Sequence, residues 1–326
     1  MQNKLIPSLI LSGTTVVFSF LFLVGFASAY EIQDLENVAV SNDFVLGPGK
    51  IELFMDPGDE ATRELLITNR LGKTMDFNVE IEDFRGSRDI NENVVLLGQE
   101  RGPYSLKDYI LPERYQFSLN HGQRMILPVK IKIPLDAEPG GLYGSVIITT
   151  SNPQEKLKSE KEKASSQVKV VSRLGALLFV RVSGDVHEDG LLKDFSVKNN
   201  QRFFEKTPIA FQILFENNGR VHLLPYGLIE IKNILGAKID EVKIDPWFVM
   251  PDSLRLREIT WDKKPLFGKY TATIGVNRGY NDIVDQRSVS FWIIPWKIIL
   301  AAAIVLILLA LFLRWLFSTF EIRRRA

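Results

Sequence analysis

The stretch MILPVKIKI (Met125–Ile133) decides the fold class of this chain. Apolar side chains occupy every odd-numbered position, and Lys130 and Lys132 lie between them, so one face of a strand would be buried and the other would face water. The same alternation recurs at Phe77–Ile81 and at Ile209–Phe215. Short alternating strands with little helical periodicity predict an all-β protein built from antiparallel sandwiches.

The length of the chain predicts more than one sandwich. It has 326 residues, and about 267 of them lie between Tyr30 and Trp296, which is more than a single hydrophobic core usually serves. We therefore expect two tandem Ig-like β-sandwich domains, separated at the polar connector SGDVHEDG (Ser183–Gly190). The expected bounds are residues 30–184 and 185–292.

A charged segment at residues 151–167 is a competing candidate for the boundary. It contains KLKSEKEK (Lys156–Lys163), and mixed charges of this kind are typical of a solvated surface. A first domain that ended before this segment would lack the long apolar strand expected at Val168–Val182. We therefore predict an exposed loop within the first domain.

An apolar run near the C-terminal end predicts a membrane anchor. Residues Ile298–Leu313 carry no charge, and a helix needs roughly 20 apolar residues to cross a bilayer, so we expect a transmembrane helix over 293–314. Basic residues favour the cytoplasmic side, and Arg323–Arg325 lie just beyond the run. The short tail at 315–326 is then cytoplasmic, and the sandwiches of this single-pass cell-membrane protein are extracellular.

The N-terminal segment predicts export. Lys4 precedes a mostly apolar stretch, Leu5–Phe26, and ASA (Ala27–Ala29) offers the small residues that signal peptidase requires. Residues 1–29 are therefore expected to form a signal peptide. The apolar stretch is longer than most secretory signals, so an uncleaved anchor is the alternative.

Two Gly-x-Tyr motifs predict a recurring structural device. Tyr143 and Tyr270 each follow a glycine by two positions, at the start of a strand that leads toward the end of its domain. That placement suits a tyrosine corner, in which the phenol bonds to backbone a few residues upstream. A ligand contact is the alternative, and the recurrence of the motif favours the structural role.

The segment Arg85–Gln116 interrupts the strand rhythm of the first domain. Ser105 and Asp108 have the spacing of a capping box, which predicts one short helical turn before Pro112. Long ordered loops often carry binding residues. The candidate ligand-binding residues are therefore the tyrosines of this segment: Tyr104, Tyr109 and Tyr115. The alternative is that this segment only covers the edge of a sheet.

One strand of the second domain shows an irregular pattern. Its apolar positions keep one face only if an extra residue is accommodated at Arg257–Glu258: Leu254, Leu256, Ile259 and Trp261. We therefore expect a β-bulge there, with Trp261 in the core.

The composition offers little catalytic or metal chemistry. The chain has no cysteine, and its three histidines lie in separate segments, so no metal-ligand spacing is present. Glu80, Glu82 and Asp83 form the densest carboxylate group in a strand, and the outer face of that strand explains them better than an acid–base pair. No nucleophile motif or phosphate-binding loop occurs. We therefore expect no enzyme activity, no cofactor and no metal.

The charge of the extracellular region argues against polyanion binding. Without the six basic residues and one acidic residue of the terminal segments, 34 basic and 38 acidic residues remain. A net charge of about −4 does not attract nucleic acid, so we expect no nucleic-acid partner.

Several motifs together resemble a family of bacterial surface proteins. They are SLKDYI (Ser105–Ile110), VKIKIP (Val129–Pro134), AEPGGLYG (Ala137–Gly144) and FENNGRVH (Phe215–His222). They resemble the tandem domains of WxL-interacting proteins, and the layout of signal peptide, two sandwiches, one helix and a basic tail matches as well. The resemblance implies binding of peptidoglycan by the first domain and of a WxL-type surface protein or host matrix by the second.

Two functions from different classes remain open at this point. The leading hypothesis is a membrane-anchored bacterial cell-surface protein whose sandwiches bind cell-wall polymer (peptidoglycan) or another surface protein. The alternative is an accessory or chaperone-like subunit of an envelope or secretion assembly, in which the sandwiches only position another protein. A partner that co-purifies with the chain, without affinity for wall material, would favour the alternative.

Overall fold

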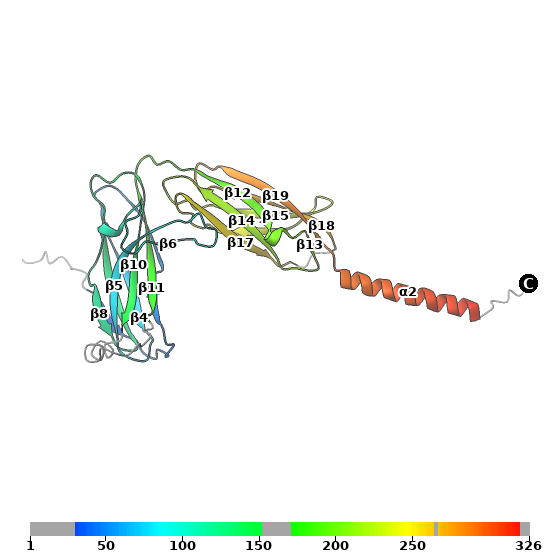
Figure 1. Cartoon of the computed structure of the whole chain (residues 1–326), viewed down its shortest axis with the longest axis horizontal. Coiled ribbons are helices and arrows are strands. Elements are labelled where there is room, and N and C mark those ends of the chain that lie inside the picture. The colour runs from blue at the N-terminus through cyan, green and yellow to red at the C-terminus, as the bar shows by residue number, and fades with distance from the viewer. Residues whose placement is uncertain (1–29, 152–170, 264–266, 320–326) are drawn as a thin grey trace, which may run out of the picture.

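The computed structural model describes residues 30–151, 171–263 and 267–319 (Figure 1). These residues form mainly β-strands, arranged as two sandwiches in series and followed by one helix. The predicted signal peptide at 1–29 lies outside the described residues. So does the predicted charged loop at 151–167, apart from Ser151.

The first sandwich contains strands β1 to β11 and one 3₁₀ turn. Their bounds are β1 (Glu31–Asp34), β2 (Phe44–Gly47), β3 (Lys50–Met55), β4 (Glu60–Asn69), β5 (Met75–Arg85), β6 (Val95–Leu96), η1 (Lys107–Tyr109), β7 (Ile110–Pro112), β8 (Gln116–Leu119), β9 (Gln123–Lys132), β10 (Gly140–Ser151) and β11 (Arg173–Val182). One sheet has the order β1-β9-β4-β2, with β7 also paired to β9. The other has the order β3-β11-β10-β5-β6, with β8 also paired to β5.

The strand predicted at Met125–Ile133 is confirmed as β9 and lies in the middle of its sheet. All five odd-numbered side chains of the predicted stretch Met125–Ile133 are fully buried. They pack with residues of the opposite sheet, including Ile51 and Val146, in one hydrophobic core. The period-2 pattern therefore buries one face of β9 between the two sheets, as expected.

The second sandwich has the same general plan with fewer strands. Their bounds are β12 (Gly190–Val197), η2 (Lys198–Asn200), β13 (Phe203–Phe204), β14 (Ile209–Asn217), β15 (Tyr226–Asn233), β16 (Lys238–Ile244), β17 (Ser253–Trp261), β18 (Gly268–Asn277) and β19 (Val284–Ile293). The sheets have the orders β12-β14-β17 and β13-β19-β18-β15-β16. Their core contains Trp261, which is buried as predicted.

β17 is regular, so the β-bulge expected at Arg257–Glu258 is wrong. The strand pairs with β14 in unbroken register along its whole length. Arg255 and Arg257 lie on its inner face, where the expectation had placed apolar side chains. Their guanidinium groups lie 3.9 Å from the ring centre of Phe248 and 5.0 Å from that of Trp247, respectively. The charged guanidinium groups themselves cover the aromatic rings. Burial lowers the pKa of the Arg255 guanidinium.

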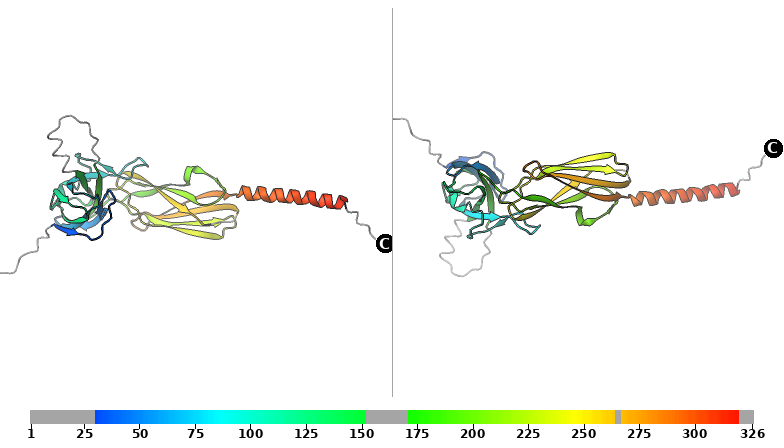
Figure 2. Two further views of the ribbon diagram at one scale, coloured as in Figure 1. Left: turned by 90° about the horizontal axis from the view of Figure 1, so that it is seen from below. Right: turned by 90° about the horizontal axis from the view of Figure 1, so that it is seen from above.

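A single helix, α2 (Trp296–Thr319), follows β19 after two residues. The segment Trp296–Phe317 has a mean hydropathy of 2.8 and is not buried in the protein. At 1.5 Å per residue it extends about 33 Å, which is long enough to cross a bilayer. Compared with the expected helix at 293–314, α2 starts later because Ile293 ends β19. Figure 2 shows that α2 leaves the second sandwich at the end away from the first.

Candidate functional site

The two sandwiches meet at a third cluster of buried side chains. Phe84, Tyr143 and Phe179 come from the first sandwich, and Met250 comes from the loop before β17 in the second. The ring of Phe179 lies 5.3 Å from that of Phe84 and 5.7 Å from that of Tyr143, centre to centre. Because this packing removes apolar surface of both sandwiches from water, it holds them together.

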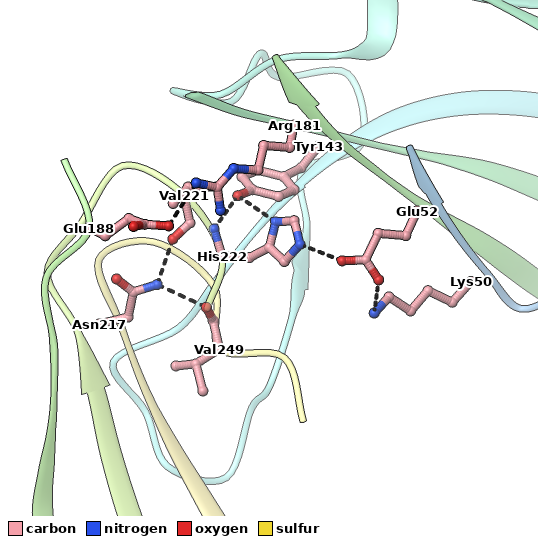
Figure 3. A network of polar contacts seen from close by, with 9 residues as sticks. All are labelled: Lys50, Glu52, Tyr143, Arg181, Glu188, Asn217, Val221, His222 and Val249. Atoms are coloured by element: carbon pink, nitrogen blue, oxygen red, sulfur yellow. Dashed lines mark hydrogen bonds and ion pairs between the residues drawn. The ribbon is translucent and has the colours of Figure 1, made fainter. Parts of the chain in front are cut away.

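The loop after β14 carries His222 into this junction. Asn217, fully buried at the end of β14, donates from Nδ2 to the carbonyl oxygens of Val221 and Val249, both at 2.9 Å (Figure 3). Its Oδ1 accepts the backbone N–H of Gly219, also at 2.9 Å. Side-chain bonds of this kind fix the local backbone. The residue after Val221, His222, therefore has a defined position.

His222 connects Tyr143 of β10 to Glu52 of β3 (Figure 3). Its backbone N–H donates to the Tyr143 hydroxyl at 2.7 Å, and its Nδ1 lies 3.2 Å from the same hydroxyl. Its Nε2 lies 2.8 Å from Oε1 of Glu52. Nε2–H donating to Glu52, with Nδ1 accepting the phenol proton, satisfies all three groups. Lys50 pairs with the other oxygen of Glu52 at 2.9 Å.

The surroundings shift the pKa of two groups in this chain of contacts. The pKa of the Glu52 carboxyl is lowered from 4.5 to about 2, mainly by the hydrogen bond from His222. Burial opposes this shift, and Lys50 adds to it. Burial raises the pKa of the Tyr143 hydroxyl above its ordinary value of 10. At neutral pH Glu52 is therefore ionised and Tyr143 is protonated, which are the states that their hydrogen bonds require.

A second brace comes from the β5–β6 loop of the first sandwich. The carbonyl of Ser87 accepts the backbone N–H of Leu254 at 3.0 Å, and Arg88 forms an ion pair with Glu216 of β14. Gly86 packs directly on the second sandwich, because a Cβ atom there would lie 2.5 Å from a side-chain carbon of β17. The loop and the second sandwich are thus in contact through residues other than those of the His222 loop, next to Met250 of the buried cluster.

The junction has the features of a structural clamp. His222 is only 4% exposed, and its backbone N–H and both ring nitrogens are engaged by Tyr143 and Glu52. No group of three or more His, Asp or Glu side chains within the described ranges could hold a metal ion. The arrangement fixes the relative position of two sandwiches, and Glu52, Tyr143 and His222 satisfy one another's hydrogen bonds.

The three candidate ligand-binding tyrosines have different surroundings. Tyr104 belongs to the junction, because its ring lies 6.0 Å from that of Tyr143 and its hydroxyl donates to Asp252 of the second sandwich at 3.1 Å. Tyr109, in η1, packs against the core of the first sandwich. Tyr115 is 53% exposed. Two of the three rings are therefore used in packing.

Asp83 shapes the loop that carries Tyr104. Its carboxylate accepts the backbone N–H groups of three residues in that loop at 2.9–3.1 Å: Gly102, Leu106 and Lys107. Glu80 is exposed, as expected of an outer strand face, whereas Glu82 and Asp83 are buried rather than solvated. The predicted helical turn is present as η1, but the predicted cap by Ser105 is wrong, since no side chain caps this turn.

Tyr143 does not make the bonds expected of a tyrosine corner. Its hydroxyl bonds to His222, which lies 79 residues downstream, rather than to backbone a few residues upstream. The glycine of the motif has a clear reason, since a Cβ atom on Gly141 would lie 2.0 Å from the Tyr143 hydroxyl. Tyr270 is buried and its ring stacks on Phe291, 6.0 Å away. A corner at Tyr270 stays a prediction.

Glu52 and His222 were not predicted as partners. They lie 170 residues apart, and no local pattern joins them. In the structure, Asn69 of β4 makes the same three bonds as Asn217. It donates to the carbonyls of Lys73 and Leu119 and accepts from the N–H of Leu71.

No protein-family model matches the sequence, and no curated protein matches it significantly. Among solved structures, the class 5 fimbriae chaperone CfaA aligns with a TM-score of 0.36 and 9% identity, over 78% of this chain and 100% of that chain. The chaperone–tip subunit complex CsuC–CsuE of Acinetobacter baumannii Csu pili aligns with a TM-score of 0.34 and 13% identity, over 67% of this chain and 90% of that chain. The E. coli chaperone DraB aligns with a TM-score of 0.33 and 15% identity, over 77% of this chain and 96% of that chain. The resemblance to WxL-interacting proteins stays a prediction.

Proposed function

We propose that this chain is a non-enzymatic, membrane-anchored subunit of a bacterial envelope assembly. In this proposal, two Ig-like domains at residues 30–184 and 185–292 form a rigid elbow outside the cell membrane, and α2 anchors the elbow. Its role is to hold a partner protein in a fixed orientation relative to the bilayer. Binding of wall polymer, which led the sequence analysis, stays a prediction.

The double connection between the sandwiches carries this proposal. Domains joined by a small polar interface are expected to move relative to one another. Here a buried aromatic cluster and the bonds of His222 fix one side of the junction, and the β5–β6 loop fixes another. A fixed angle serves a protein that positions a partner. Capture of a long, flexible polymer does not require one.

The wall-polymer hypothesis has lost most of the surface on which it depended. Stacking on sugar rings requires aromatic faces that are accessible together. Tyr104 is engaged by Tyr143 and Asp252, and Tyr109 packs on the first core. Tyr115 remains as an exposed ring, and it provides the variant that separates the two functions.

A sheet edge gives the elbow a way to bind protein. β17 is a terminal strand of its sheet and is nine residues long. Backbone groups at such an edge can pair with an extended segment of another chain. β16 is also a terminal strand, but its charged side chains protect an edge from pairing: Lys238, Asp240, Glu241 and Lys243. We place the partner on the part of β17 beyond Leu254, because Ser87 of the first sandwich already accepts the N–H of Leu254.

Affinity purification of the tagged full-length chain from its own envelope, after mild cross-linking, tests the proposal. We expect a protein partner to co-purify with the wild type and with Tyr115→Ala. The partner should be lost with Gly86→Leu, because a leucine does not fit against β17 and the angle of the elbow changes. Circular dichroism serves as the control and should show that Gly86→Leu keeps its β-sheet content.

Two outcomes contradict the proposal. One is equal recovery of the partner by a folded Gly86→Leu variant, which would make the angle irrelevant. The other is sedimentation of the chain with purified wall fragments that is lost in Tyr115→Ala, which would restore the wall-polymer function.

A further inference from the structure

Large apolar side chains are exposed at the end of the second sandwich from which α2 leaves. The tip of the β15–β16 hairpin carries Ile234 and Leu235, which are 68% and 87% exposed. Phe203 of β13 and Phe267, just before β18, are each 61% exposed. We call these four residues the basal face. Exposed apolar residues gathered at one end of a domain mark a contact surface.

The strand register places the basal face at the level of the end of β19. Gly268, next to Phe267, pairs with Ile293, the last residue of β19. Phe203 pairs with Trp292. The hairpin tip lies at the same level, because the last residue of β15 pairs with the third residue of β18. Figure 1 shows β13 and β18 at the end next to α2.

The connection from this end to α2 is short and braced. Ile294 donates its N–H to the carbonyl of Phe204 at 2.7 Å, and Lys297 in the first turn of α2 pairs with Glu205 at 3.0 Å. Two connecting residues extend at most about 7 Å. When α2 spans a bilayer, the basal face therefore lies level with the lipid headgroups.

We propose that the basal face docks on the lipid surface of the bilayer that α2 spans. Apolar side chains beside the helix enter the interfacial layer, where such groups are favoured. A cavity of about 770 Å³ beside Phe203 is lined in part by Arg202, Lys269 and Trp292. Its two cations suit headgroup phosphates, and the indole suits the interfacial zone.

This inference rests on the membrane anchoring in the proposed function and adds a constraint to it. A sandwich joined to its anchor by two residues alone could still tilt about that connection. Docking of the basal face removes the tilt. Together with the clamp at the junction, it would fix the direction of the first sandwich relative to the membrane.

Site-specific fluorescence tests the docking, because the chain has no cysteine. The full-length chain is placed in nanodiscs of phosphatidylcholine and phosphatidylglycerol, one copy per disc, with an environment-sensitive probe on Leu235→Cys. Leu306→Cys, within α2, and Phe54→Cys, which is 74% exposed on β3, carry the probe as controls. We expect spin-labelled lipid to quench the probes at 235 and 306 at least about threefold more than the probe at 54.

The three positions separate failure of the docking from failure of the anchor. Quenching at 306 without quenching at 235 would overturn the docking and leave the anchor in place. A blue-shifted but unquenched probe at 235 would assign the basal face to protein contact, which also overturns it. Absence of quenching at both positions would overturn the anchor as well.

A second set of variants tests the apolar contact itself. With the probe on Phe203→Cys, the double change Ile234→Asp with Leu235→Asp should reduce lipid quenching to the level of the probe at 54. Leu228→Asp, which changes an exposed leucine of β15 five residues before the end of the strand, is the matched control and should leave the quenching unchanged. Equal quenching in both variants would contradict the proposal.

Discussion

At the residue scale, Glu52 links the stability of the junction to pH. A carboxyl with a lowered pKa stabilises the folded state above its ordinary pKa of 4.5, and this contribution is lost as the pH falls toward the folded value of about 2. The carboxylate is partly exposed, which weakens the effect. We expect Glu52→Gln to lower the free energy of unfolding by about 1–2 kcal/mol at pH 7, measured by thermal or chemical unfolding of the full-length chain in nanodiscs.

Repeating the unfolding measurement at several pH values tests whether the charge of Glu52 causes the stability difference. The stability difference between the wild type and Glu52→Gln should be constant from pH 7 to about pH 5 and should narrow as the pH falls from 4.5 toward 2. Glu60 is the matched control, because Lys130 and Lys132 also lower its pKa to about 2, but it is solvent-exposed. Glu60→Gln should have the smaller effect. A difference for Glu52→Gln that persisted unchanged at pH 3 would contradict the assignment.

Burial of individual residues was predictable where it depends on their own strand alone. The alternation in β9 and β14 identified buried side chains correctly, because a period of two fixes which side chains share a face. The same reasoning failed for Asp83, whose burial depends on backbone N–H groups 19 to 24 residues away. It also failed for Tyr143, whose hydrogen-bond partner lies in the other sandwich.

At the element scale, the β5–β6 loop is expected to control the angle of the elbow. In Gly86→Ala the new Cβ would lie 2.5 Å from the Cβ of Ser253 and 2.6 Å from that of Met250. Non-bonded carbons prefer about 3.5–4.0 Å, so the loop and β17 must separate by about 1 Å or more. Spin labels on Glu64→Cys in β4 and Lys243→Cys in β16 should show a shifted or broadened distance distribution.

A second glycine provides the control for this measurement. Gly275 lies in β18, where the nearest atom to an added Cβ is 3.9 Å away, so Gly275→Ala should leave the distance distribution as narrow as in the wild type. A Gly86→Ala distribution that overlaps the wild-type one would show that the loop does not set the angle.

Elements were predictable to the extent that their pattern is local. The apolar run at the C-terminal end predicted one long helix, but the strand β19 uses its first residues, so α2 begins at Trp296. β17 was predicted with a bulge because Leu254 and Leu256 were assigned to the same face as Ile259 and Trp261. Arg255 and Arg257 occupy that face instead. The rings that they cover belong to the loop before the strand, and a single-strand pattern contains no information about that loop.

At the scale of the whole molecule, the second sandwich lies next to α2 and the first sandwich lies beyond it (Figure 2). The basal face belongs to the end of the second sandwich next to α2. If α2 crosses the membrane with its C-terminal end in the cytoplasm, the first sandwich is the part farthest from the bilayer. The basic residues after the helix predict this orientation, because such residues favour the cytoplasmic side.

Labelling of intact cells with a membrane-impermeant maleimide tests this orientation. Glu64→Cys, exposed on β4 of the first sandwich, should react without permeabilisation, because it would lie outside the cell. Phe317→Cys, exposed near the C-terminal end of α2, should react only after permeabilisation. The reverse pattern would place the elbow inside the cell, where it could not meet a partner in the envelope, and reaction at both sites in intact cells would show that α2 does not cross the bilayer.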